Sequence, residues 1–191
     1  MIVDQPPHQP VHRVHVVQGE QYVDDKPDTV LTTILGSCIS ACLWDAERGL
    51  GGMNHFLLPG DGVNSQDTSG GTPSSRYGVY AMELLVNDLL RRGARRDRMQ
   101  AKLFGGACMI RGLTDIGNLN ANFAEKFLQN EGIPVVGGSL RGTHGRRVQF
   151  WPNSGRARQV LLKDEAESLF RSEYQTFVSK PPRPAGSIEL F

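Results

Sequence analysis

Cysteine is scarce in this chain, whose 191 residues contain only three, an odd number. A disulfide framework needs paired cysteines, so the class of small disulfide-stapled secreted domains is excluded and a reducing compartment is expected. Long apolar runs are also lacking, and no stretch approaches the roughly 20 residues that span a membrane. The opening residues MIVDQPPHQP contain neither a basic segment nor a long apolar one, which argues against a secretory signal. We therefore expect a cytoplasmic protein that is not embedded in a membrane.

An excess of charge of one sign is lacking as well. Lys and Arg number 21 and Asp and Glu number 20, which gives a formal net charge of +1. No overall field attracts nucleic acid, so no nucleic-acid partner is expected. The hydrophobic fraction of 39% and the length are sufficient for one domain with a buried core. We expect a flexible tail over residues 1–12, one domain over 13–180 and a proline-rich tail over 181–191.

The stretch from Thr32 to Pro59, TTILGSCISACLWDAERGLGGMNHFLLP, contains the strongest candidate site. Apolar runs with β-branched and aromatic residues flank a short loop with Asp and Gly, a pattern that predicts a β-hairpin. If the turn centres near Glu47, Cys38 lies opposite a position near 56, and His55 is within one residue of it. Cβ atoms of opposite residues lie roughly 5 Å apart, so the thiol and imidazole can come within hydrogen-bonding reach. The register is an assumption, because a slip of one residue turns every side chain to the other face.

Other interpretations of the same residues remain open. Most buried cysteines are inert, and a histidine in an apolar run is usually a core residue with its hydrogen bonds satisfied. A zinc site is a further alternative, although cysteines spaced along a strand do not resemble the tight turns of typical zinc sites; its ligands would be Cys38, Cys42, His55 and Cys108. The histidines at 8, 12 and 15 have no Cys or carboxylate at a recognised ligand spacing. We expect neither a metal nor another cofactor.

A resemblance to a known family favours catalysis. The motifs LGSC, CLWD, GGMNHFLLP, YGVYAMELL and AKLFGGACM follow one another between about Val30 and Pro152. In this combination and order they resemble the chemoreceptor glutamine deamidases of the CheD family. The resemblance implies that Cys38 is the nucleophile and His55 its base, and that Thr32, six residues before the cysteine, orients the imidazole. Backbone N–H groups near Cys38 would stabilise the oxyanion, with Gly36 and Ser37 forming that part of the site.

The function that this resemblance implies is hydrolysis of glutamine side chains to glutamate on methyl-accepting chemotaxis receptors. The cytoplasmic helices of those receptors would be the partner, and a CheC-type phosphatase is a second candidate partner. The alternative is a non-catalytic binding module that regulates receptors or such a phosphatase. One segment departs from the family pattern, because Ser139 to Gly142 reads SLRG where an aspartate and a glycine pair are expected. His144, next to this segment, is an alternative base in a glycine-rich setting that suggests exposure.

The fold class that we expect is α+β, with antiparallel strands in a β-sandwich-like core and helices outside. Strands are predicted at 11–17, 29–35, 101–104, 133–136, 146–151 and 159–162, and helices at 77–92, from Asn118 or Asn120 to Asn130, and from Asp164 to Val178. The loop Gly60–Arg76 is rich in Gly, Ser, Asp and Thr, and we leave open whether it is a lid over the substrate or a passive insertion. Five arginines lie between Arg91 and Arg98, where they either steer an acidic partner or form a solvated helix end.

Overall fold

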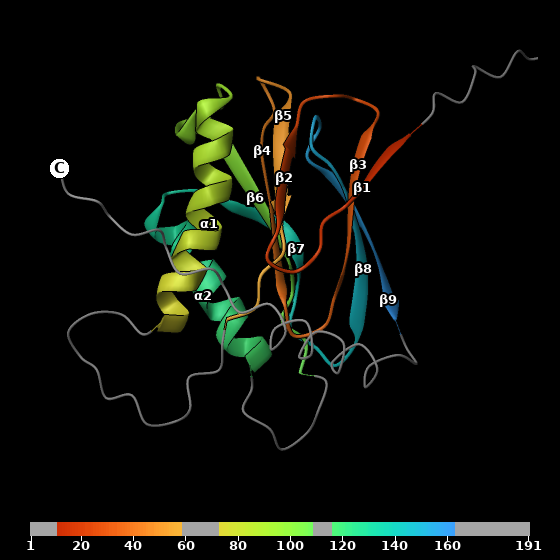
Figure 1. The fold of residues 1–191 in the computed structure, drawn as a ribbon, viewed down its shortest axis with the longest axis vertical. Coiled ribbons are helices and arrows are strands. Elements are labelled where there is room, and N and C mark those ends of the chain that lie inside the picture. Colours follow the sequence, from red (N-terminus) through yellow and green to blue (C-terminus); the bar gives the residue numbers. More distant parts are fainter. Residues whose placement is uncertain (1–10, 59–72, 109–115, 163–191) are drawn as a thin grey trace, which may run out of the picture.

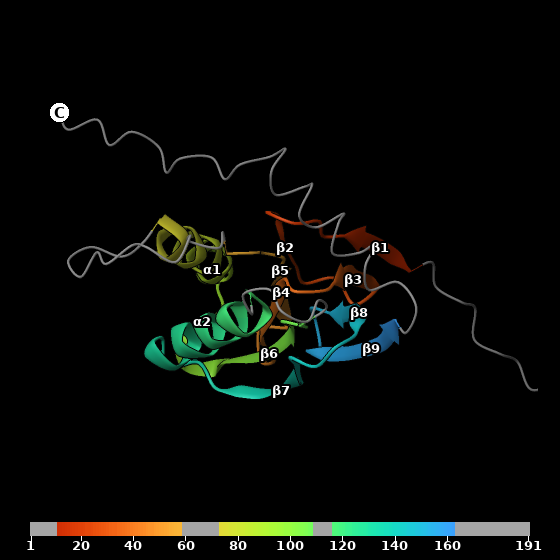
Figure 2. The same cartoon turned by 90° about the horizontal axis from the view of Figure 1, so that it is seen from below.

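Two β-sheets lie face to face in the computed structural model, which describes residues 11–58, 73–108 and 116–162 (Figure 1). Figure 2 shows the three layers of this part of the chain in order: two helices, then a five-stranded sheet, then a four-stranded sheet. The helices cover one side of the five-stranded sheet, and the four-stranded sheet covers the other. The expected α+β class with a sandwich-like core is confirmed.

The chain forms its elements in the order β1 (His12–His15), β2 (Gln21–Asp24), β3 (Thr29–Leu35), β4 (Ile39–Asp45), β5 (Leu50–Asn54), α1 (Pro73–Arg91), a 3₁₀ turn (Arg96–Arg98), β6 (Met99–Gly105), α2 (Ile116–Asn130), β7 (Val135–Leu140), β8 (Gly145–Trp151) and β9 (Arg156–Leu162). The strand order is β2-β5-β4-β6-β7 in one sheet and β1-β3-β8-β9 in the other. Most neighbours are antiparallel, as expected, but β1 with β3 and β6 with β7 are parallel. Parallel neighbours need a crossover, and the chain supplies it through β2 in one case and α2 in the other.

Strand β4 separates two hydrophobic cores because its side chains alternate between the two faces of the sheet. Ile39, Ala41 and Leu43 point to the helices, where they belong to a core with residues of α1 and α2. Cys38, just before the strand, and Cys42 belong to the core between the two sheets. The predicted hairpin is therefore the boundary between both cores. The even-numbered residues of β4 and the odd-numbered residues of β5 face the second sheet.

Helix α1 buries most of the apolar stripe that its sequence predicts. Met82, Leu85, Val86 and Leu89 are buried, whereas Val79, which we had placed in the stripe, is exposed. The arginines that follow the helix pair with carboxylates: Arg92 with Asp88, Arg95 with Asp97, Arg96 with Glu131, and Arg98 with Asp45 and Glu47. These ion pairs leave little unbalanced charge to steer an acidic partner at this end of the molecule.

Several predicted boundaries were wrong, and two of them concern residues near the candidate site. Helix α2 begins at Ile116, so neither Asn118 nor Asn120 caps it. Asn120 lies within the helix, and its side chain is buried. Strand β7 continues to Leu140 through residues that we had assigned to a loop. Pairing with β6 overrides their low strand propensity, and Gly138 has a φ of 129° at a place where a Cβ would overlap the Leu103 carbonyl oxygen.

Residues 1–10 of the predicted N-terminal tail, the C-terminal tail, the third helix and residues 60–72 of the predicted loop lie outside the described residues. His12, which we had placed in the tail, begins β1. Residues 73–76, which we had placed in that loop, begin α1. Within the part of the chain that the structure describes, no helix has the length and apolar character needed to cross a membrane.

Candidate active site

The turn that carries Cys38 connects β3 to β4, and hydrogen bonds to three successive carbonyl groups hold its backbone. The Gly36 carbonyl accepts a hydrogen bond from Ala107 N (2.8 Å), and the Cys38 carbonyl accepts one from Gly106 N (2.8 Å). Gly105, with a φ of 111°, lies so close that a Cβ there would overlap the Cys38 carbonyl oxygen. The two glycines at the end of β6 therefore let this strand approach the Cys38 backbone.

Asn120 fixes the third carbonyl and joins the turn to the segment that follows His55. Its Nδ2 donates to the Ser37 carbonyl oxygen at 3.0 Å, and its Oδ1 accepts from Leu58 N at 2.8 Å. The side chain is fully buried, so both bonds are made away from water. The sequence suggested only a helix cap for this residue, and nothing local in the sequence indicates its contact with a turn more than eighty positions earlier.

His55 lies on the same face of the hairpin as Cys38, but one step from the expected register. Cys42 pairs with Met53 and Ile39 bridges to Phe56, so His55 lies across from Ser40, and Cys38 is its diagonal neighbour. Diagonal neighbours have Cα atoms about 7–8 Å apart, within reach of an imidazole side chain. The predicted hairpin is confirmed. In the predicted register His55 would have faced away from Cys38, and the observed shift by one residue brings both side chains to one face.

The imidazole of His55 is held through its Nδ1 atom by Thr33. Thr33 Oγ1 donates to the Val16 carbonyl oxygen at 2.7 Å, so its proton is already engaged. The 2.9 Å contact between Thr33 Oγ1 and His55 Nδ1 must then be donated by an N–H on Nδ1. Val16 O is also 3.5 Å from Nδ1, which favours the same tautomer. Nε2 therefore carries the lone pair.

The Nε2 atom is buried and has no hydrogen-bond partner among the described residues. A buried nitrogen with a lone pair and no partner is costly in a purely structural site, because it has lost its hydration. Burial also lowers the pKa of His55 to about 4, since the charged ring is disfavoured away from water. At neutral pH the ring is therefore uncharged and can accept a proton.

Thr32, the threonine that we expected at the imidazole, lies on the opposite face of β3. It lines a pocket on the outer side of the four-stranded sheet together with residues of β1, β8 and β9. Thr33 lies on the inner face, fully buried. Successive side chains of a strand point to opposite faces, so the structure brings Thr33, and not Thr32, to His55.

The other two cysteines have different surroundings. Cys42 is fully buried in the core between the sheets, and this burial raises its pKa to about 12, which leaves the thiol protonated and unreactive. Cys108 is half-buried, and its backbone N–H donates to the Gly142 carbonyl at 2.8 Å. Among the described residues, no three His, Cys, Asp or Glu side chains are grouped closely enough to hold a metal ion.

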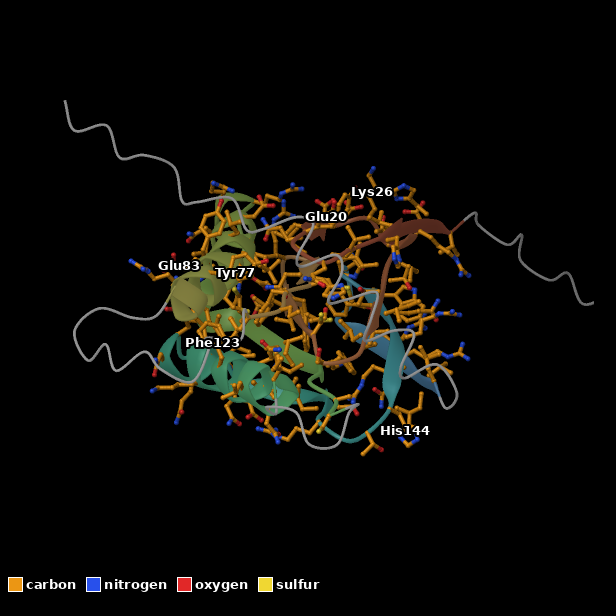
Figure 3. All side chains as sticks on the ribbon, turned by 60° about the horizontal axis from the view of Figure 1, so that its bottom comes forward. Glu20, Lys26, Tyr77, Glu83, Phe123 and His144 are labelled. Carbon is orange, nitrogen blue, oxygen red and sulfur yellow. The ribbon has the colours of Figure 1, made fainter. Side chains whose placement is uncertain are left out.

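His144, the alternative base, is exposed and touches Thr143 rather than a cysteine. In Figure 3 it projects at the edge of the molecule, far from Tyr77 and Glu20. The segment before it, which departs from the family pattern, is held by the buried guanidinium of Arg146. This group donates to the carbonyl oxygens of Ser139, Arg141 and His144.

Comparisons with known proteins show the family of the chain. The family described as "CheD chemotactic sensory transduction" matches residues 57–160. The chain is 62% identical over 179 residues to a protein of Acidiphilium cryptum (strain JF-5) named "Probable chemoreceptor glutamine deamidase CheD", covering 94% of this chain and 93% of that protein. Proteins with the same name from Caulobacter vibrioides (strain NA1000 / CB15N) and Rhizobium leguminosarum bv. trifolii (strain WSM2304) are 52% identical over 183 residues and 54% identical over 180 residues. These alignments cover 94% of this chain and 93% and 96% of the two relatives.

Proposed function

The chain belongs to the CheD family, and from this membership we propose that it deamidates glutamine side chains of chemoreceptors with Cys38 as nucleophile. The observation that carries the mechanism is the state of His55. Its Nδ1–H is held by Thr33, its ring is neutral at pH 7, and its buried Nε2 lies on the face that it shares with Cys38. This is the arrangement that a general base needs beside a thiol.

The reaction has two halves. In the first, His55 Nε2 takes the thiol proton while Cys38 Sγ bonds to the amide carbon and the carbonyl electron pair moves onto oxygen. The intermediate collapses by breaking the C–N bond, and His55 gives its proton to the departing ammonia. In the second half, His55 takes a proton from water, which attacks the thioester. The C–S bond breaks, and glutamate and the restored thiol result.

Thr33 acts on the imidazole rather than on the substrate. Its hydroxyl holds the ring in the tautomer that presents Nε2, which is the orienting task of the third member of a catalytic triad. Being neutral, the hydroxyl stabilises the imidazolium less than a carboxylate would. Thr33 is therefore a positioning residue in this proposal, in the place first assigned to Thr32.

The backbone of the Cys38 turn supplies donors for the oxyanion. The carbonyls of Gly36 and Ser37 are held toward Ala107 and Asn120, and in a trans peptide the following N–H points the opposite way. The N–H groups of Ser37 and Cys38 are thus fixed in direction before substrate binds, as preorganised stabilisation requires. Gly36, without a side chain, leaves room for a substrate to approach.

The proposed substrates are the cytoplasmic helices of methyl-accepting receptors, which places the protein in the cytoplasm. The test is incubation of receptor cytoplasmic fragments with the protein in H₂¹⁸O, followed by mass spectrometry of peptides. Each converted glutamine should gain about 3 Da, because hydrolysis of the thioester adds one ¹⁸O. Cys38→Ala is the control and should give no conversion. Binding of the fragment without conversion by the wild-type protein would instead favour the regulatory module, for which a CheC-type phosphatase is the further candidate partner.

A further inference from the structure

The loop between β1 and β2 is built around His55 and carries Gln18 to the nucleophile. Gly19 N donates to the His55 carbonyl at 2.7 Å, and His55 N donates to the Glu20 carbonyl at 3.0 Å. Gly19 has a φ of 86°, a conformation that glycine adopts without strain. These bonds fix the backbone directly after Gln18.

Gln18 contacts the reacting sulfur directly. Its Oε1 lies 3.6 Å from Cys38 Sγ and accepts the hydrogen bond of the thiol, in surroundings that are partly buried. The side chain ends in a carboxamide with two donors on nitrogen and an acceptor on oxygen. Rotation about its last torsion angle is easy and exchanges the two ends, so the same group can accept from the thiol or donate to an anion.

We propose that Gln18 is a catalytic residue that donates a hydrogen bond from Nε2 to the oxyanion of the tetrahedral intermediate. This inference rests on the proposed deamidation. Once the thiol proton has moved to His55, Oε1 has no donor to accept from, and the carboxamide turns its nitrogen to the new anion. The oxyanion is bonded to the carbon that Sγ has attacked, so it lies within about 3 Å of the sulfur and in reach of a donor at the Gln18 position.

Tyr77 is the competing side-chain donor near the sulfur. Burial raises the pKa of its phenol, and the Cys38 thiolate raises it further, so the hydroxyl stays protonated at neutral pH. The phenol is half-buried and packs against the core beside the helices (Figure 3). Tyr77→Phe therefore separates the two candidates, because it removes one hydroxyl and keeps the ring.

The test compares turnover with thiol reactivity. Gln18→Ala should lower kcat for the receptor fragment about a hundredfold and change KM little, because an oxyanion donor acts in the transition state. Alkylation of Cys38 by iodoacetamide forms no oxyanion, so its rate should stay within about threefold of wild type. Gln18→Glu, which has the same shape but no donor at neutral pH, should be at least as slow as Gln18→Ala.

The matched control is Gln129→Ala on the exposed side of α2, which should leave kcat unchanged. An unchanged kcat in Gln18→Ala overturns the proposal, and so does a loss found in Tyr77→Phe instead. A parallel fall of alkylation and kcat also overturns it, because Gln18 would then act on the thiol. Wild-type conversion is measured in the same assay, so failure of the deamidase proposal itself is recognised separately.

A second, independent feature is a basic pocket on the outer side of the four-stranded sheet, which we call the arginine face. It has a volume of about 460 Å³ and is lined by two residues from each strand: Arg13 and His15, Thr32 and Ile34, Arg147 and Gln149, and Arg158 and Val160. Such a volume is within the usual range of ligand pockets. No carboxylate belongs to this lining.

The arginines of this face differ from those at the end of α1 and just after it. Arg13, Arg147 and Arg158 make no side-chain hydrogen bond or ion pair with a described residue, whereas the cluster after α1 is paired throughout. Three guanidinium groups without counter-charges in one concavity repel one another, and an anionic ligand relieves this repulsion. Each guanidinium can bind a carboxylate through two parallel hydrogen bonds.

We infer that the arginine face docks a carboxylate-rich segment of a partner protein. Ile34 and Val160 add apolar surface of the kind that contacts side chains, and a net charge of +1 provides no wide basic field for nucleic acid. The arginine face lies on the outer side of β3, whereas the candidate active site lies on its inner side. Thr32 precedes Thr33, which holds the His55 ring, and His15 precedes Val16, whose carbonyl accepts from Thr33.

The probe for this inference is a fluorescein-labelled oligoglutamate peptide, followed by fluorescence anisotropy. Arg147→Glu and Arg158→Glu together should weaken binding at least about tenfold and reduce its salt dependence. The matched control Arg91→Glu should leave binding unchanged. Thermal unfolding of each variant reports whether it is folded. Absence of binding to wild type, equal binding to the double variant, or tighter binding of inorganic phosphate or a DNA oligonucleotide would each refute a carboxylate site.

Discussion

The space between the two sheets has a polar end and an apolar middle, although one strand runs through both. At the polar end Thr33 is hydrogen-bonded to His55, and the Cys38 thiol to Gln18. In the middle, Cys42 belongs to a cluster with Trp44, Met53, Val148 and Phe150. Both cysteines have no exposed surface. Since both thiols are buried alike, the proposed difference in their reactivity rests on the groups around them, and the imidazole that can take a proton lies at the polar end.

The largest expected effect comes from exchanging the two cysteines for alanine in turn. Cys38→Ala should abolish conversion of glutamine in receptor fragments, because it removes the proposed nucleophile. Cys42→Ala should keep kcat within a few-fold and lower the free energy of unfolding by about 1 kcal/mol, since it removes one buried atom. Mass spectrometry and denaturant unfolding measure both quantities. Retained activity in Cys38→Ala with an inactive Cys42→Ala would move the nucleophile to the apolar middle.

The second prediction concerns the protonation of His55 and its effect on the free energy of unfolding. Burial lowers the pKa of His55 to about 4 in the folded protein, whereas the unfolded chain has a value near 6.5. Between these pH values the unfolded chain binds a proton that the folded protein does not, so the free energy of unfolding falls as pH decreases. The loss should approach about 3 kcal/mol at the lower limit.

Urea unfolding at several pH values measures this loss, with His55→Gln as the control. The variant lacks the titrating ring but keeps the carboxylates, among them Asp24 and Asp45, whose pKa values are lowered by their hydrogen bonds although burial opposes the shift. The difference between the two curves therefore isolates His55. Identical curves would show that the ring is not buried in its neutral form.

A smaller effect distinguishes the two faces of β3. Thr33→Val keeps the branched shape and removes the hydroxyl that holds the imidazole, so kcat should fall roughly ten- to a hundredfold. Thr32→Val removes a hydroxyl from the outer face and should leave kcat unchanged. Single-turnover kinetics on the receptor fragment compares them. The opposite ranking would restore the assignment made from the sequence, and wild-type rates in both would leave a Cys-His pair without a third member.

The hairpin could be predicted because apolar alternation and turn residues are local signals, whereas its register, on which the shared face of Cys38 and His55 depends, could not. The identity of the threonine could not be taken from spacing, but alternation contains a clue. Thr33 falls between Leu31 and Leu35, which are both buried, so the period of a strand places it on the inner face. Ile34 obscures this signal, because an apolar residue also stands on the outer face.

Gln18 and Asn120 were missed for a different reason. Both act through contacts with residues twenty or more positions away, made possible by the layer order and by glycines at the end of β6. No local pattern distinguishes these amides from ordinary polar residues. The α+β class followed from the separate helices and strands, whereas the two parallel strand pairs depend on crossovers that the sequence does not specify.

The three held carbonyls of the Cys38 turn have a consequence for the order in which the chain acquires activity. Their donors belong to the end of β6 and to α2, segments that are synthesised long after the turn itself. Folding intermediates in which those segments have not docked contain the thiol and imidazole but no rigid turn between them. Such intermediates should not deamidate glutamine. Hydrogen exchange at Gly106 and Ala107 should then report the same opening that switches turnover off.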